Sequence, residues 1–269
     1  MQRMVISALF LGMAFVSLEA LQGSYTTSFT QTENPISEGS RWINGKTVGL
    51  DWSNVAVSSG VAYGTQRGID GYNDSLAVLS GTWGPDQTAE ATVHSINQVG
   101  GNTFQEVELL LRFAISAHSA RGYEINFRAV NTSEAYSQIV RWNGSLGNFT
   151  LIDSRGGTAY GIKEGDVVKA TIVGNKITTY INGVAKFSVT DSTFSNGAPG
   201  MGFYLQGSGV TSNYGFTKFT ASDGGSNNVP APPSNLRIIS LSLLGLWHTD
   251  ASNFSASPMR QTMRLFESR

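Results

Sequence analysis

Acidic side chains alternate with apolar ones along two stretches in the middle of the chain. Residues 105–115 place Glu106 and Glu108 on one face and an apolar series on the other, and residues 122–128 place Glu124 on a similar polar face. Alternation with a period of two is typical of a β-strand with one buried face. Two carboxyl groups about 5–5.5 Å apart, one of them protonated, can hydrolyse a glycosidic bond with retention of configuration. The spacing therefore allows acid–base chemistry on one sheet face.

Four predicted strands have to position these carboxyl groups, and they span residues 105–115, 122–128, 136–142 and 149–153. In the first two strands, one face is Val, Leu, Ile, Phe and Tyr, and the other is mainly Glu, Asn and Arg. We expect the apolar face to pack into a core and the polar face to be wet.

A second series of strands follows over residues 165–221. Apolar and polar residues alternate over 168–172 and again over 177–181, and a Gly-Asn and an Asn-Gly pair predict tight turns after these two strands. We interpret the whole stretch as a meander of four or five half-buried antiparallel strands.

The sequence of this stretch resembles the C-terminal half of domains of the concanavalin A-like lectin and glucanase superfamily, especially its laminin-G-like modules. The resemblance lies in the order Gly-Asn, Tyr-Ile-Asn-Gly, Pro-Gly, Phe-Tyr and a final Phe-x-x-Phe strand, and it covers most of residues 21–221. It implies an all-β fold, a two-sheet antiparallel β-sandwich of the jelly-roll type. It also implies that an N-terminal strand pairs with the last one, which would make Phe29 and Phe219 neighbours in the core.

In jelly rolls of this superfamily, the concave face of one sheet commonly holds a glycan. Mapped onto this chain, the resemblance nominates as ligand-binding residues Glu106, Glu108, Arg112, Glu124, Asn126, Arg128, Gln138, Trp142, Tyr204 and Gln206. Carboxylate, amide and guanidinium groups bond sugar hydroxyls, and aromatic rings stack on the apolar side of a pyranose. The alternative is that these charges only pair across a solvated sheet face, and that Trp142 points inward as a core residue.

Two hypotheses make the protein an enzyme, a glycosidase or a polysaccharide lyase. In each case the sequence departs from the motif of the enzyme family that it resembles. The laminarinase-type glycosidase motif resembles Glu106-Val107-Glu108-Leu109-Leu110, but Leu110 stands where a carboxylate is required. Glu124 on a neighbouring strand leaves a different carboxyl pair open.

The second enzymatic form is a jelly-roll polysaccharide lyase, which is similar in fold to alginate lyases. Its residues would be Arg112, Gln138 and either Tyr204 or Tyr214, neutralising a uronate carboxylate and abstracting a proton. Val140 stands where that family has a histidine, and His118 and His94 fall elsewhere.

A structural calcium is the one cofactor that the sequence suggests, because relatives often bind one. Asp51, Asp70, Asp74 and Asp86 fall in predicted loops and are its candidate ligands, although loop aspartates also form turns. The chain has no Cys and three scattered His residues, so thiolate sites and a histidine metal motif are excluded.

The two ends of the chain differ in composition from the predicted sandwich. Residues 1–20 have Arg3 followed by an apolar run, which predicts a secretory signal peptide and a secreted, extracellular or periplasmic protein with no membrane partner once the signal is removed. Residues 222–233 form a Gly/Ser/Pro linker, and 234–269 are a truncated or disordered tail.

These observations together favour a carbohydrate-binding, lectin-like domain that recognises a polysaccharide or oligosaccharide on a concave sheet face. A polysaccharide-degrading lyase or glycoside hydrolase is the alternative, and a laminin-G-like adhesion module is the third reading. The formal net charge of −1 gives no reason to expect a nucleic-acid partner.

Overall fold

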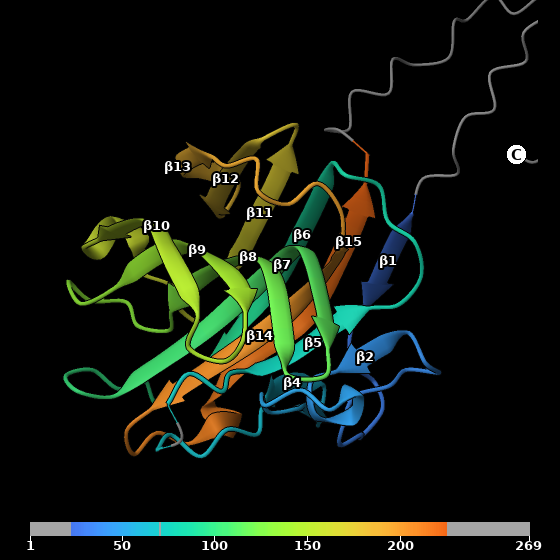
Figure 1. The fold of residues 1–269 in the computed structure, drawn as a ribbon. Coiled ribbons are helices and arrows are strands. Elements are labelled where there is room, and N and C mark those ends of the chain that lie inside the picture. Colours follow the sequence, from blue (N-terminus) through green and yellow to red (C-terminus); the bar gives the residue numbers. More distant parts are fainter. Residues whose placement is uncertain (1–22, 70, 225–269) are drawn as a thin grey trace, which may run out of the picture. The chain divides into compact units, whose positions relative to one another are not determined.

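The computed structural model describes residues 23–69 and 71–224, in which antiparallel strands form two sheets that pack face to face (Figure 1). The eight-stranded sheet has the order β13 (Val184–Thr190), β12 (Lys176–Ile181), β11 (Val167–Val173), β6 (Gln87–Ser95), β15 (Tyr214–Asp223), β4 (Val61–Gly64) and β3 (Val55–Ser58), with β1 (Ser24–Thr27) beside β15. The seven-stranded sheet has the order β10 (Phe149–Gly156), β9 (Tyr136–Gly144), β8 (Ser119–Arg128), β7 (Phe104–Ser116), β14 (Ala198–Gln206), β5 (Ser75–Leu79) and β2 (Trp42–Asn44). The predicted all-β, two-sheet sandwich is confirmed.

The helices of the described residues are three 3-10 turns, η1 (Lys46–Val48), η2 (Thr158–Tyr160) and η3 (Thr211–Asn213). None of the helices in this part of the chain is long and apolar enough to cross a membrane.

The first and last strands of the sandwich pair with each other, as predicted. β1 lies antiparallel to β15, with Thr27 opposite Phe219. Phe29 and Phe219 are both fully buried in the core between the sheets. This pairing joins segments that are about as far apart in the described sequence as two segments can be, so the sandwich closes only when both ends are in place.

Four or five strands are expected between residues 165 and 221; five are present, but they do not form one meander. β11, β12 and β13 are neighbours in the eight-stranded sheet, while β14 crosses to the seven-stranded sheet and β15 returns. The tight turns are where the sequence predicts them, with Gly174 and Gly183 at positive φ. Alternation of apolar and polar residues indicates that a strand has one buried face. Because both sheets have such a face, alternation does not indicate to which sheet a strand belongs.

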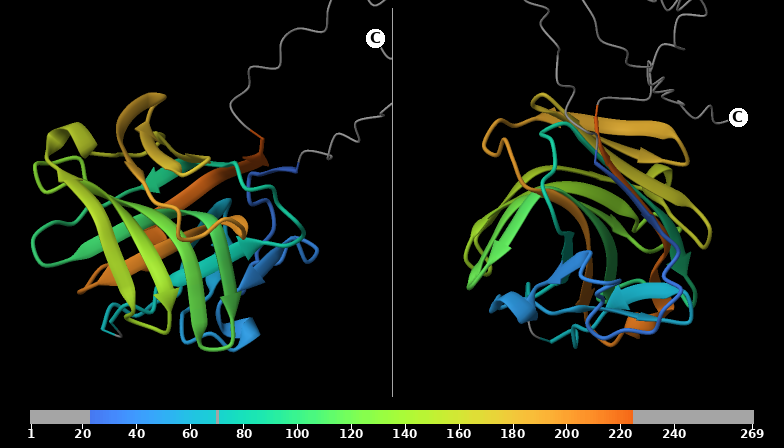
Figure 2. Two further views of the ribbon diagram at one scale, coloured as in Figure 1. Left: turned by 45° about the horizontal axis from the view of Figure 1, so that its top comes forward. Right: turned by 90° about the vertical axis from the view of Figure 1, so that its right-hand side faces the viewer.

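The predicted wet face of the seven-stranded sheet is instead largely buried. Val107, Leu109 and Leu111 point into the core as expected, but Glu106 and Glu108 on the opposite face are buried too. A second apolar cluster covers that face, and it consists of Leu50, Trp52, Leu76, Val78, Leu110, Phe113, Ala120, Val140, Trp142 and Ala198. The right-hand view of Figure 2 shows the seven-stranded sheet bent into an arch, with the segment around β2 on its inner side.

Several predicted segments lie outside the described residues. These are the signal peptide over residues 1–20, most of the linker and the tail over 234–269. β15 itself continues to Asp223, slightly beyond the predicted sandwich boundary at Ala221.

Candidate functional site

A pocket opens on the inner face of the seven-stranded sheet. Its lining residues are Tyr72, Asp74, Glu106, Glu108, Glu124, Asn126, Gln138, Val140, Trp142, Phe149 and Tyr204. Its volume of about 80 Å³, counted as space open to the centre of a water molecule, leaves room for several waters or an ion.

Strand register brings the polar side chains of this pocket together. Glu108 of β7 lies opposite Asn126 of β8, and Asn126 lies opposite Gln138 of β9. Side chains at directly opposed positions share one face of a sheet, and residues two apart on one strand share it as well. Seven of the ten ligand-binding residues predicted from the sequence line the pocket as a result: Glu106, Glu108, Glu124, Asn126, Gln138, Trp142 and Tyr204.

Three carboxyl groups form the floor of the pocket. Asp74, Glu108 and Glu124 have carboxylate oxygens within 4.8 Å of one another, and all three side chains are buried. No Lys or Arg belongs to the pocket lining. This buried acidic triad could hold a metal ion.

Burial shifts the titration of these acids strongly. It raises the pKa of Glu124 to about 7, although hydrogen bonds from Trp142 and Asn126 work in the opposite direction. The pKa values of Asp74 and Glu108 are also raised well above their ordinary range by burial, with neighbouring carboxylates adding to the effect. Some of these groups are therefore protonated at neutral pH unless a cation neutralises them.

Glu106 stands beside the triad and has a partner of its own. The hydroxyl of Tyr136 donates a hydrogen bond to its Oε1. Burial raises the pKa of Glu106 to about 8, while Tyr136 and the charge of Arg128 lower it and Glu124 raises it. Tyr136 was not among the predicted site residues, because it lies at the start of a strand whose pattern singles out no tyrosine.

Aromatic rings form the outer rim of the pocket. Tyr72 is 51% exposed and stacks on Tyr204 with ring centroids 6.3 Å apart and an interplanar angle of 14°. Its other neighbour is Phe149, at 5.0 Å in an edge contact. The sequence analysis did not predict Tyr72, because it lies in a loop before β5. It did not predict Phe149 either, because the contact of Phe149 with Tyr72 joins segments that are remote in sequence. Asp74 was considered there only as a loop ligand for calcium.

Trp142 is neither an exposed platform nor part of the core between the sheets. It is 2% exposed, packs against Trp52 and Phe149, and donates a hydrogen bond of 2.6 Å from Nε1 to Glu124 Oε2. Trp142 therefore forms a wall of the pocket and orients a carboxylate, which leaves stacking to the tyrosines.

Arg112, Arg128 and Gln206 lie outside the pocket lining. A bulge in β7 between Leu111 and Ala114 turns Arg112 away, and its guanidinium donates hydrogen bonds to the carbonyls of Pro85, Gly174 and Phe194. Arg128 donates to the carbonyls of three loop residues, Gly101, Thr103 and Glu134. Gln206 accepts a hydrogen bond from the hydroxyl of Tyr204.

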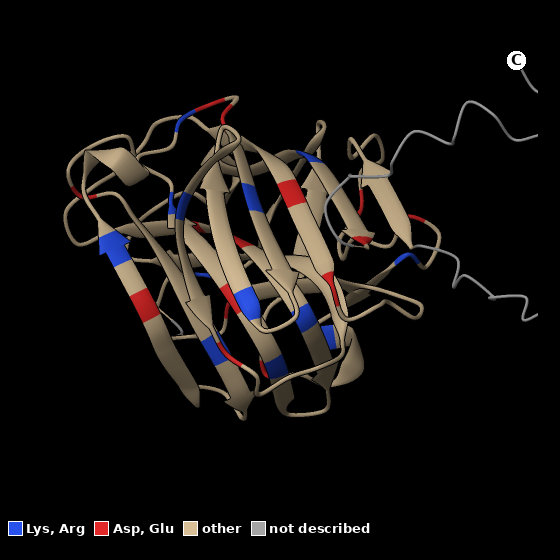
Figure 3. Cartoon of the chain, turned by 90° about the horizontal axis from the view of Figure 1, so that it is seen from above, with Lys and Arg blue, Asp and Glu red and all other residues tan. Residues whose placement is uncertain are grey.

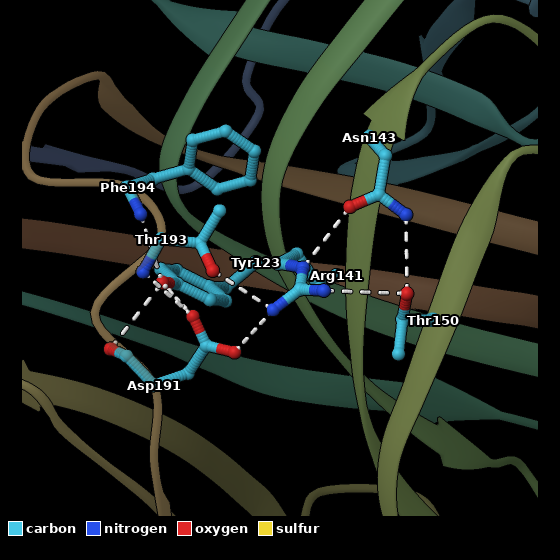
Figure 4. A network of polar contacts seen from close by, with 7 residues as sticks. All are labelled: Tyr123, Arg141, Asn143, Thr150, Asp191, Thr193 and Phe194. Atoms are coloured by element: carbon cyan, nitrogen blue, oxygen red, sulfur yellow. Dashed lines mark hydrogen bonds and ion pairs between the residues drawn. The ribbon is translucent and has the colours of Figure 1, made fainter.

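A separate polar network holds the edges of the two sheets together (Figure 4). Asp191, in the loop after β13, accepts hydrogen bonds from the hydroxyl of Tyr123 at 2.7 Å and from Arg141 at 2.5 Å. These bonds, with those from Thr193, lower the pKa of Asp191 despite its partial burial. Asp191, Arg141 and Tyr123 each have a hydrogen-bond partner within this network, so we interpret its role as structural.

Comparisons with known proteins find similarity in structure. No protein-family model matches the chain, and no curated protein matches its sequence. A carbohydrate-binding module, CBM66, from Bacillus subtilis is 17% identical with a TM-score of 0.45, over 70% of this chain and 95% of the module. A β-glucanase from Bacillus licheniformis is 15% identical with a TM-score of 0.43, over 74% of this chain and 94% of its own.

The potassium-bound carbohydrate recognition domain of Emp46p is a further neighbour, 14% identical with a TM-score of 0.46, over 73% of this chain and 94% of that domain. At these identities and TM-scores the likeness carries no argument about this chain's function, which rests on the pocket itself.

Proposed function

We propose that this protein binds a carbohydrate at the mouth of the acidic pocket. The observation that carries the proposal is the combination of an exposed aromatic rim, Tyr72 with Tyr204 and Phe149, and buried carboxyl and amide groups directly beneath it. Aromatic faces stack on the apolar side of a sugar ring, while carboxylates and amides bond its hydroxyls.

The charges in the pocket favour a saccharide without acidic groups. Four carboxyl groups, from Asp74, Glu106, Glu108 and Glu124, line the pocket without a Lys or Arg among the lining residues. A uronate carboxylate would enter this pocket without a cationic side chain to pair with, which is unfavourable for a buried charge. Arg112, which a lyase of the predicted kind would need at the substrate, bonds to loop carbonyls instead. A neutral polysaccharide or oligosaccharide is therefore the proposed ligand.

The test is binding of a panel of neutral and uronate polysaccharides to the wild-type protein and to Tyr72→Ala. We expect retention on at least one neutral glycan, and about a fivefold loss of affinity in the variant, because a stacking ring contributes about 1 kcal/mol. Tyr160→Ala is the matched control, since Tyr160 lies in η2 and is not a lining residue. Retention only on uronates, or equal affinity in a folded Tyr72→Ala, would contradict the proposal.

A glycoside hydrolase is the second candidate, and one observation of register favours it. Leu110, which stands where the glycosidase motif requires a carboxylate, pairs directly with Glu124 on the next strand. A carboxyl group with a pKa of about 7 thus lies one strand away from the missing one, beside Glu106 and Glu108. New reducing ends from a neutral glycan, lost in Glu124→Gln and Glu106→Gln, would establish hydrolysis, and binding without them would leave a binding module.

Three finer expectations belong to this proposal. Export rests on the pattern of residues 1–20, and N-terminal sequencing of protein from the culture medium would test it. A laminin-G-like adhesion role would show as retention on a protein partner with no retention on any glycan. Calcium remains a proposal. Of its four predicted loop ligands, Asp70 lies outside the described residues, Asp74 lines the pocket, Asp51 contacts His118, and Asp86 accepts a hydrogen bond from the amide of Gly174.

A further inference from the structure

Four oxygen atoms at the floor of the pocket are buried without a hydrogen-bond partner. They are Asp74 Oδ1, Glu108 Oε1, Glu108 Oε2 and Asn126 Oδ1. Glu108 is fully buried, and Asn126 is 4% exposed. Buried oxygen atoms in native proteins nearly always have a partner, so four of them in one small pocket indicate a missing electropositive group.

The residues that carry these oxygens all line the same pocket, and the hydrogen bonds around them leave the four oxygens without a donor. Asn126 donates its Nδ2 hydrogens to Glu124 Oε1 and Gln138 Oε1, which leaves its Oδ1 as an acceptor without a donor. Trp142 donates to Glu124 Oε2 from the side, and Tyr136 donates to Glu106. The surrounding donors therefore orient the acids but leave the carboxylate of Glu108 unpartnered. Asn126 thus adds a buried neutral oxygen without a donor to the unpartnered oxygens of the acidic residues.

We infer that Asp74, Glu108 and Glu124, together with Asn126 Oδ1, form a calcium site at the floor of this pocket.

The chemistry of the ligand set favours an oxygen-binding cation such as calcium over zinc. Every nearby ligand is a carboxylate or amide oxygen, and no His or Cys lines the pocket, which disfavours zinc. Calcium takes six to eight oxygen ligands at about 2.3–2.6 Å, so oxygens on opposite sides of the ion lie up to about 5 Å apart. The carboxylate oxygens of the triad lie within 4.8 Å of one another, which fits around one ion. The pocket also leaves room for waters to complete the shell.

The strands that carry the ligands make the site rigid. Glu108, Glu124 and Asn126 lie on β7 and β8, which pair along most of their length, and Asp74 comes just before β5. β14 separates β5 from β7, and its residue opposite Glu108 is Gly202. A Cβ at position 202 would lie 2.1 Å from Glu108 Oε2, so the missing side chain gives the Glu108 carboxylate its place.

The inference goes beyond saccharide binding and is tested without any saccharide. The full chain is treated with EDTA, dialysed and titrated with Tb³⁺ while Trp is excited, because Trp142 touches a ligand and would sensitise a bound lanthanide. We expect saturable luminescence that Ca²⁺ displaces, and a rise in Tm when Ca²⁺ is added to the stripped protein.

Variants then locate the ion. Glu108→Gln and Asp74→Asn should each weaken Ca²⁺ binding at least tenfold, and Asn126→Ala should weaken it less because a neutral ligand is lost. Glu90→Gln is the matched control, since Glu90 lies on β6 of the other sheet and should leave Ca²⁺ affinity unchanged. Circular dichroism checks that each variant is folded.

Two results would overturn the inference. The first is a wild-type protein that shows neither sensitised luminescence nor a Ca²⁺-dependent change in Tm, which needs no variant to interpret. The second is unchanged Ca²⁺ affinity in folded Glu108→Gln and Asp74→Asn. Because glycans are absent throughout, failure here would leave the saccharide proposal standing, and glycan retention with no Ca²⁺ binding would show the two to be separate.

Discussion

The carboxyl groups of the pocket are costly to bury, and each depends on a different local arrangement. Glu106 has the hydroxyl of Tyr136, Glu124 has the indole of Trp142, and Glu108 has no donor among the described residues. Acids kept apart from water and close to each other are common at sites that bind or react, because such an arrangement weakens the fold unless a ligand compensates for it. The side chains that we propose for binding are thus also the ones whose burial lowers the stability of the fold.

The close approach of Gly202 to Glu108 predicts the effect of one added methyl group. Gly202→Ala would bring its Cβ to 2.1 Å from Glu108 Oε2 and 2.9 Å from a methyl carbon of Leu76, so the carboxylate has to move. We expect a loss of about 1–3 kcal/mol in the free energy of unfolding, measured by urea denaturation. In Gly156→Ala, the control, the new Cβ meets nothing closer than 3.5 Å and stability should change little.

The raised pKa of Glu106 predicts how the EDTA-treated protein responds to pH. The folded-state pKa is about 8 against an ordinary value of 4.5, so the folded state binds the proton more tightly than the unfolded one. The contribution of Glu106 to the free energy of unfolding is then fully present below about pH 4.5. It is lost as the pH rises through 8, and the loss is roughly 2–5 kcal/mol. Urea titrations at pH 5 and 9 measure this, and Glu106→Gln should reduce the difference. An equal loss in that variant would assign the effect to other groups.

Contacts between elements decide which parts of the sandwich stay together. Arg141 on β9 and Asp191 after β13 connect the outer strands of the two sheets, where Tyr123 also contributes its hydroxyl (Figure 4). The bulge in β7 also connects distant segments. It turns Arg112 away from the pocket, so that its guanidinium donates hydrogen bonds to carbonyls in three loops. These features are invisible in the alternation of residues, since they depend on a break in it.

The lowered pKa of Asp191 predicts a stabilising contribution that disappears in acid. Because the folded-state pKa lies below the ordinary value of 3.8, the contribution is present above that value and is lost as the pH falls through the folded-state pKa. Asp191→Asn should cost about 1–3 kcal/mol at pH 7 in urea denaturation, and the variant and wild type should converge near pH 2. Asp153→Asn is the control, because Asp153 pairs with the exposed Arg155 on a single strand. A constant difference across pH would contradict this account.

At the scale of the whole molecule, neighbours in space are distant in sequence. β1 and β6 pair with β15, and β7 pairs with β14, so the eight-stranded sheet is complete only with β15 and the seven-stranded sheet only with β14. Charges are spread along the strands in both signs, with no basic stripe in the view of Figure 3. The sandwich is therefore held by its shared core rather than by any one segment.

This topology predicts a single cooperative unfolding transition. Far-UV and near-UV circular dichroism should give coincident urea curves, because the two sheets share one core and cannot unfold independently. Two separated midpoints would show that one sheet survives the loss of the other. Folding should be slow, in the range of milliseconds to seconds, because non-local strand pairs dominate.

The sequence alone determined the class of fold, the tight turns at Gly174 and Gly183 and most of the polar residues that meet on one face. Alternation with a period of two is local, and Gly-Asn and Asn-Gly turns act within four residues, so both can be read directly. That is why Glu106, Glu108, Glu124 and Asn126 were found together.

Only the tertiary structure decided that this polar face is buried, that Arg112 leaves it and that Asp74 and Tyr72 join it. Those outcomes depend on an apolar cluster drawn from both ends of the described chain, on a bulge and on a loop before β5. Each of them is set by packing between segments that are remote in sequence, and no local pattern records such contacts.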